Sequence, residues 1–133
     1  MKRSFERSFD ALAEIFDFTR EFFAAECVDE QHRTEVDFAI EEIFTNMVKY
    51  HPQATAEIEI ELERDGGRLR VALTDHDVEP FDVTRAPGVR TDLPLEQRKP
   101  GGLGLHLTRK LMSSVTYDYD DRTSRIVMTK ELD

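Results

Sequence analysis

The chain has 133 residues, of which 39% are hydrophobic and 35% charged, enough for one domain over residues 1–133 with a buried core. Its net charge of −10 argues against nucleic acid as a direct partner, because phosphate binding requires a basic surface. The single cysteine, Cys27, excludes an intrachain disulfide and a multi-cysteine metal site, and we expect it to pack as a small apolar residue.

The N-terminal half combines a charged start with two helical patterns. Its first ten residues carry no apolar run, and no stretch of the chain reaches the length of a membrane span, so we expect a cytoplasmic protein without membrane contact. Residues 1–5 are compatible with a short strand or a frayed lead-in. Apolar residues at steps of three and four predict a helix over 8–27 and a second over 30–50, which ends at His51-Pro52.

The period of the sequence changes to two between residues 56 and 64, where Ile and Leu alternate with Glu, as in a strand with one wet face. Asp65-Gly66-Gly67 predicts a hairpin turn, and the returning strand ends at Asp75. Residues 76–100 hold four of the five prolines and little periodicity, which indicates a long irregular loop. Such loops are commonly functional.

A third helix and a second hairpin follow this loop. Leucines at helical spacing after the glycines predict the helix, and residues 115–119 and 125–128 predict the two strands. The order α-α-β-β-loop-α-β-β predicts an α+β fold, a two-layer α/β sandwich with helices on one face of a mixed, mostly antiparallel sheet.

Three of the six glycines, Gly101, Gly102 and Gly104, open the third helix. The first N–H groups of a helix have no internal partners, so glycines there let an anion such as phosphate approach the main chain. The glycines alone are equally compatible with a simple turn.

Two further patterns carry polar groups. Glu42, Asn46 and Lys49 share one face of the second helix, with Glu35 before them. This stripe is either a solvated face or a set of groups suited to Mg²⁺, phosphate and proton transfer. Asp75, at a strand end, is either a turn former or an acceptor for a ligand amino group.

In this order and spacing, the three patterns resemble the GHKL (Bergerat-fold, histidine-kinase-like ATPase) superfamily, and in particular the small anti-sigma-factor serine/threonine kinases. The segment AIEEIFTNMVKY (39–50) is similar to the family's N-box, and PFD (80–82) to the segment after its adenine-binding Asp. The most specific match is LPLEQRKPGGLGLHLTRKLMSSVTY (93–117), which resembles the G2 box with its helix and strand. The likeness covers nearly the whole chain.

The resemblance implies a site for ATP and Mg²⁺. In it Asn46 would coordinate Mg²⁺ bridging the phosphates, Glu42 would be the catalytic general base, and Asp75 would accept from the adenine amino group. Gly102 and Gly104 would contact phosphates through their amides, and residues 83–100 would form the ATP lid. The implied ATP contacts also include Lys49, Phe81, Arg98, Lys99, Gly101, Leu103 and Leu105.

One departure from the family concerns the adenine box. The family's Asp-x-Gly reads Asp75-His76-Asp77 here, and the segment up to Phe81 is one residue longer than in the family. This departure is compatible with ATP binding that is weakened, altered or lost. Asp accepts a positive φ more readily than most residues, but it brings bulk and charge.

The resemblance implies a protein serine/threonine kinase that phosphorylates a serine of a STAS-domain anti-sigma factor antagonist and sequesters a sigma factor, with a homodimer expected. The alternative, supported by Asp77, is a catalytically weak or inactive binding module that acts by sequestration. A third hypothesis is an ATP-hydrolysing conformational switch.

Overall fold

The computed structural model describes residues 1–85 and 102–132, without the side chains of residues 85, 102 and 103. Its elements follow the predicted order, and residues 1–5, which the sequence left open, contain a strand. The elements are β1 (Lys2–Phe5), η1 (Phe9–Ala11), α1 (Leu12–Ala25), α2 (Gln31–Tyr50), β2 (Ile58–Asp65), β3 (Arg68–His76), η2 (Val83–Arg85), α3 (Gly102–Leu111), β4 (Ser114–Asp120) and β5 (Thr123–Glu131).

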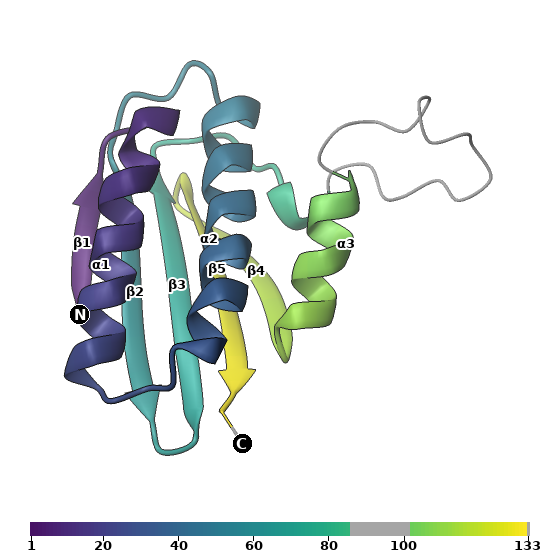
Figure 1. Ribbon diagram of the computed structural model, residues 1–133. Helices are drawn as coiled ribbons and strands as arrows, with labels where there is room; N and C mark the ends of the chain where they lie inside the picture. Colours follow the sequence, from purple (N-terminus) through teal and green to yellow (C-terminus); the bar gives the residue numbers. More distant parts are fainter. Residues whose placement is uncertain (86–101, 133) are drawn as a thin grey trace.

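The strands form one sheet in the order β1-β2-β3-β5-β4. Helices α1 and α2 lie side by side over one face of this sheet, and α3 lies beside α2 (Figure 1). Each of the four described pairings is antiparallel, so the mixed, mostly antiparallel sheet that the sequence predicted is wholly antiparallel in this part of the chain. The predicted α+β class and two-layer arrangement are confirmed.

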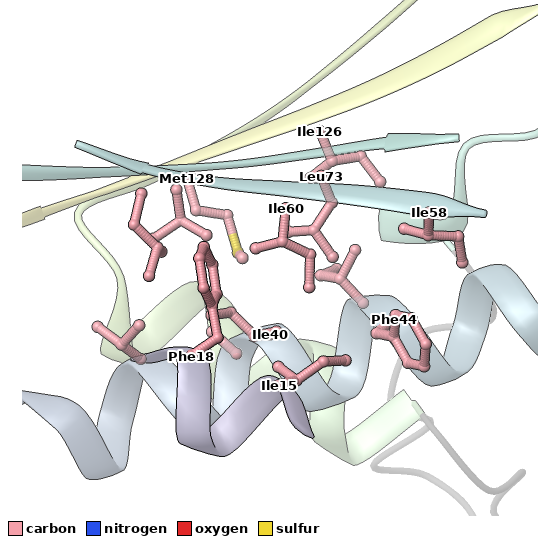
Figure 2. Packing of buried hydrophobic residues seen from close by; sticks show 14 of the residues in the cluster. Ile15, Phe18, Ile40, Phe44, Ile58, Ile60, Leu73, Ile126 and Met128 are labelled. Carbon is pink, nitrogen blue, oxygen red and sulfur yellow. The ribbon is translucent and has the colours of Figure 1, made fainter. Parts of the chain in front are cut away.

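The core lies between the helices and the inner face of the sheet (Figure 2). Alternate residues of the strands point inward, as the period of two predicts, and meet the apolar faces of α1 and α2. Fully buried members include Ile15, Phe18, Ile40, Phe44, Ile58, Ile60, Leu73, Ile126 and Met128. Each such side chain contributes about 1.5–3 kcal/mol relative to exposure, so this layer supplies the main force that holds α2 on the sheet.

The end of α1 corrects the expectation for Cys27. This residue is exposed, with a φ of 55°, and follows the last turn of the helix. The N–H of Cys27 donates to the carbonyl of Ala24 (3.3 Å) and that of Val28 to the carbonyl of Phe23 (3.0 Å). These two bonds form a Schellman motif, which requires a left-handed residue, so backbone geometry overrides the apolar character of the thiol.

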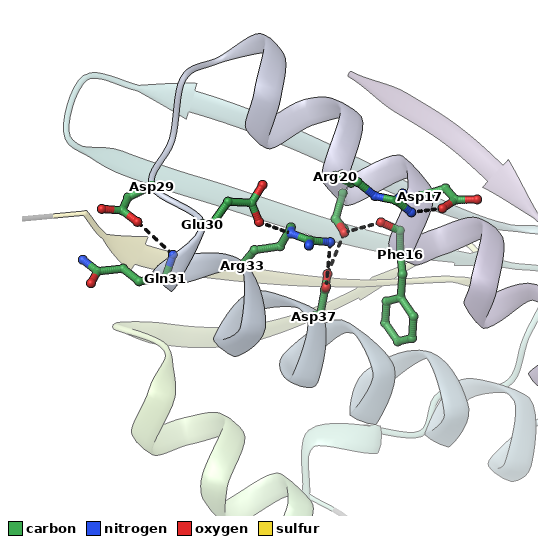
Figure 3. Close-up of polar contacts among 9 residues, drawn as sticks. Phe16, Asp17, Arg20, Asp29, Glu30, Gln31, Arg33 and Asp37 are labelled. Atoms are coloured by element: carbon green, nitrogen blue, oxygen red, sulfur yellow. Dashed lines mark hydrogen bonds and ion pairs between the residues drawn. The ribbon is translucent and has the colours of Figure 1, made fainter.

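A side-chain hydrogen bond joins α1 to α2, beside ion pairs of Arg33 (Figure 3). Asp37 accepts from the Thr19 hydroxyl at 2.7 Å and lies 3.7 Å from Arg33, which also pairs with Glu30. Burial raises the pKa of the Asp37 carboxyl, whereas the Thr19 hydrogen bond and Arg33 lower it.

Among the described residues, no helix is long and apolar enough to cross a membrane.

Candidate functional site

The polar stripe on α2 is only partly a solvated face. Lys49 is exposed and Glu42 half-buried, but Asn46 is buried. Its Nδ2 has no hydrogen-bond partner within residues 1–85 and 102–132. A buried amide without a partner is uncommon in proteins and indicates a place where a further polar group binds. For Asn46 the structure therefore rejects the interpretation as a solvated face.

Helix α3 packs against α2, and Gly104 lies against the Glu42 carboxylate. A Cβ on Gly104 would lie 2.6 Å from Glu42 Oε1, and closer still to Oε2 and Cδ. Real Cβ atoms essentially never approach other atoms within 3.0 Å, so only glycine leaves the carboxylate in its present position. The glycine predicted to admit a phosphate thus also makes room for Glu42.

The environment of Glu42 changes its acidity. Burial raises the pKa of its carboxyl, Lys49 lowers it, and the neighbouring Glu41 raises it again. The Asn46 amide is near enough to lower the Glu42 pKa slightly, although no described acceptor meets the geometry of a full hydrogen bond to Nδ2. A carboxylate with a raised pKa is a stronger proton acceptor than one in open water.

Two contacts near the carboxyl end of α3 fix this helix to its neighbours. The buried ammonium of Lys130, on β5, donates to the carbonyl of Leu111 at 2.8 Å and to Glu35 at 3.2 Å. It therefore binds the carboxyl end of α3, where helix carbonyls lack internal partners, to a side chain of α2. Arg109 donates to the carbonyl of Thr84 at 2.8 Å, which links α3 to η2.

Asp75 lies at the end of the central strand β3, opposite Ile58 on β2 and Ser124 on β5. Its side chain is 0% exposed and forms an ion pair with Arg7, whose side chain is 8% exposed. Arg7 also donates through Nη1 to the carbonyl of Met47 at 3.1 Å. The interpretation of Asp75 as a simple turn former is wrong, because its carboxylate is buried and paired with a residue 68 positions away.

Several polar atoms around Asp75 have no partner in the described part of the chain: Arg7 Nε, His51 Nε2, Asp75 Oδ2 and Ser124 Oγ. Burial raises the pKa of Asp75, while Arg7, His51 and His76 lower it. Burial also lowers the pKa of His51, which favours its neutral form. This end of the sheet therefore retains unused hydrogen-bonding capacity.

Asp77 stands where the resembled family has glycine, and its backbone keeps the conformation that glycine favours, with a φ of 56°. Its side chain is 77% exposed and accepts from Arg122 Nε at 2.8 Å. Arg122 also pairs with Glu79 at 2.9 Å, and its carbonyl accepts from the N–H of Val78 at 3.0 Å. The bulk and charge expected of Asp77 are thus turned toward the β4–β5 turn and compensated there.

A pocket of about 530 Å³ opens beside this segment. Its lining includes Phe81, Tyr50, His51, Asp77 and Arg122. The Phe81 and Tyr50 rings lie 5.1 Å apart at an interplanar angle of 31°. Its volume suits a small organic ligand. Neither Asp75 nor the Glu42–Gly104 contact lines it, so it adjoins these groups rather than enclosing them.

Sequence reasoning missed four residues near these groups: Arg7, Tyr50, His51 and Arg122. Tyr50 directly follows Lys49, so the end of the α2 motif was a usable signal. No local pattern pointed to Arg7 or Arg122, since both reach the site through tertiary contacts.

The remaining predicted residues are only partly described. Arg98, Lys99 and Gly101 lie outside the described residues, as do positions 86–100 of the expected lid. Gly102 and Leu103 form the first turn of α3. Leu105 is buried in the hydrophobic core, where it anchors α3.

Comparison with known proteins identifies relatives of this arrangement. A family model described as histidine kinase-like ATPase domain matches residues 5–130. No curated protein matches the chain. The chain has 16% identity to the solved RsbU and RsbW domains of Rv1364c from Mycobacterium tuberculosis, with a TM-score of 0.69, covering 99% of this chain and 31% of that one.

Two further solved structures share the fold. The SiaB–SiaC complex from Pseudomonas aeruginosa gives 16% identity and a TM-score of 0.62 over 98% of this chain and 87% of that one. The Acinetobacter baumannii histidine kinase AdeS gives 14% identity and a TM-score of 0.53 over 100% and 68%. The chain spans less than a third of the Rv1364c structure. At identities of 14–16%, these structural similarities show a shared fold alone.

Proposed function

Because the chain belongs to the histidine kinase-like ATPase domain family, we propose that it is an ATP-dependent regulatory protein kinase. Its substrate is a serine of a STAS-domain anti-sigma factor antagonist, and it also sequesters a sigma factor. The observation that carries this proposal is the environment of Glu42. Its half-buried carboxylate has a raised pKa, lies against Gly104 and is close to Asn46, whose Nδ2 has no described partner. Structural likeness to chains with RsbW and SiaB in their names supports it.

The described residues fit ATP with Mg²⁺ through their unused groups. The unpartnered Asn46 Nδ2 would donate to a phosphate oxygen, and the amide oxygen of Asn46 would coordinate Mg²⁺. The amides of Gly102 and Gly104 would face phosphate at the start of α3. Asp75 Oδ2 would accept from the adenine amino group. Within the described residues no group of three or more His, Cys, Asp or Glu could hold a metal, so Mg²⁺ would be held largely by phosphates, as is usual for this ion.

Glu42 is the proton acceptor in this proposal. ATP provides the phosphoryl group and Mg²⁺ the charge neutralisation when both are bound. As the substrate hydroxyl oxygen bonds to the γ-phosphorus and the bond to the β-phosphate oxygen breaks, Glu42 takes the hydroxyl proton. Its raised pKa and its fixed position against Gly104 favour this role.

A second candidate function is a binding module that sequesters a partner without phosphorylating it. Two observations favour it: Arg7 occupies one oxygen of Asp75, and Asp77 replaces the glycine of the adenine box. Absence of nucleotide binding at millimolar ATP with Mg²⁺, measured by calorimetry, would support this function over the kinase.

The kinase proposal is tested by Glu42→Gln, with Glu41→Gln as the matched control. Glu41 is exposed and lies about 100° around the helix from Glu42. Transfer from labelled ATP to a STAS-domain protein should fall roughly 10²–10⁴-fold in Glu42→Gln, since an amide cannot take the proton. ATP affinity should change little, and Glu41→Gln should behave as wild type. Near-normal transfer by Glu42→Gln would end the proposed mechanism.

A further inference from the structure

Arg7 connects three parts of the fold at the buried end of the site. It lies between β1 and η1, and its guanidinium reaches the Asp75 carboxylate on β3 and the Met47 carbonyl on α2. Met47 follows Asn46 directly, so this one side chain links the strand end to the middle of the polar stripe on α2. Both members of the ion pair are almost completely buried.

A buried ion pair is costly unless the remaining donors and acceptors of both groups are also satisfied. This pair is not complete. Arg7 Nε and Asp75 Oδ2 are buried without a hydrogen-bond partner in residues 1–85 and 102–132, although Asp75 Oδ1 and both Arg7 Nη atoms are engaged. An ion pair with only a structural role would not be expected to leave a charged acceptor unused.

We propose that Arg7 is a positioning residue for base recognition, which holds Asp75 so that its Oδ2 accepts a hydrogen bond from a 6-amino purine. Arg7 acts through Asp75 and does not touch the nucleotide itself. This inference rests on the proposed ATP binding and adds that Arg7 sets the preference of the site for a 6-amino purine.

The electrostatics of Asp75 explain why a cation is needed there. Burial favours the protonated carboxyl, and Arg7 is the strongest of the charged or titratable groups that oppose it, ahead of His51 and His76. Arg keeps its charge at any ordinary pH. Without Arg7 the Asp75 carboxyl would stay protonated up to a higher pH. An ionised carboxylate can only accept, as from a 6-amino group, whereas a protonated carboxyl can also donate to a 6-oxo group.

The test compares ATP with ITP, which differ at the 6-amino and 6-oxo groups, in calorimetric binding to the full chain with Mg²⁺. Wild type should prefer ATP. In Arg7→Met the ratio of ATP to ITP affinity should fall about 10- to 100-fold, which corresponds to the loss of one hydrogen bond to a charged group. The lost preference should return as the pH is raised and Asp75 ionises. Arg7→Lys, which retains the charge, should restore much of it at neutral pH.

Arg3→Met is the matched control, because Arg3 is also N-terminal and charged but its pair with Glu21 is exposed. It should leave the ATP/ITP ratio unchanged. If Arg7→Met does not fold, as judged by thermal unfolding, Arg7→Gln carries the same comparison. An unchanged ratio at every pH in the folded variant would overturn this inference while leaving ATP binding intact. A wild-type protein that binds neither nucleotide would overturn both this inference and the kinase proposal.

Discussion

Replacing Gly104 with alanine should separate the stability of this protein from its proposed chemistry. Gly104 lies in the first turn of α3 and does not have a left-handed backbone, so alanine fits the main chain. Alanine is favoured over glycine in helices by up to about 1 kcal/mol. On backbone grounds alone, Gly104→Ala should unfold at the same or a slightly higher temperature than wild type.

The new methyl group, however, collides with the Glu42 carboxylate. Its Cβ would lie 2.6 Å from Oε1 and closer still to Oε2 and Cδ, whereas ordinary contacts begin at 3.4 Å, so the carboxylate must retreat by at least about 0.8 Å. The colliding atoms are the end of a flexible side chain, so the retreat is energetically cheap and the fold survives it. A displacement near 1 Å at a reacting group typically costs about 10²-fold in rate.

The assay is phosphotransfer to a STAS-domain protein at saturating ATP, together with thermal unfolding of each variant. Gly104→Ala should lose about 10²-fold in transfer rate with its unfolding temperature retained. Gly66→Ala is the reciprocal control, since Gly66 has a φ of 61° and nothing within 4 Å of the added Cβ. It should lose about 1 kcal/mol of stability through its left-handed backbone and keep full activity. Full phosphotransfer by Gly104→Ala would refute the argument that the Glu42 position matters.

Two further predictions follow from single contacts. Lys49→Met should move the acid limb of the kcat–pH profile to higher pH, because Lys49 lowers the pKa of Glu42 and the base works only when it is deprotonated. Lys2→Met is the control, and an unshifted acid limb in Lys49→Met would contradict the prediction. Cys27→Gly should raise the free energy of unfolding by about 1 kcal/mol in denaturant titration, because Cys27 occupies a left-handed position that glycine adopts without strain. Loss of stability in that variant would show that the thiol contributes contacts that outweigh the backbone.

The sequence by itself determined the elements and most of their order. Periods of 3.6 and 2 depend only on neighbouring residues, so helices, strands and both hairpins were predicted to within a few residues. The same local spacing placed Glu42, Asn46 and Lys49 on one helix face, and the resemblance added Asp75 and the glycines. The first short strand stayed undecided, because four residues carry too little periodicity.

Only the tertiary structure decided how these residues meet. It buried Asn46, which a helix wheel allows to be exposed. It brought Gly104 against Glu42 and Arg7 against Asp75, pairs separated by about half the chain. It also turned Asp77 outward to Arg122. Contacts of this kind arise from packing the layers and satisfying buried charge, and no pattern within a few residues encodes them.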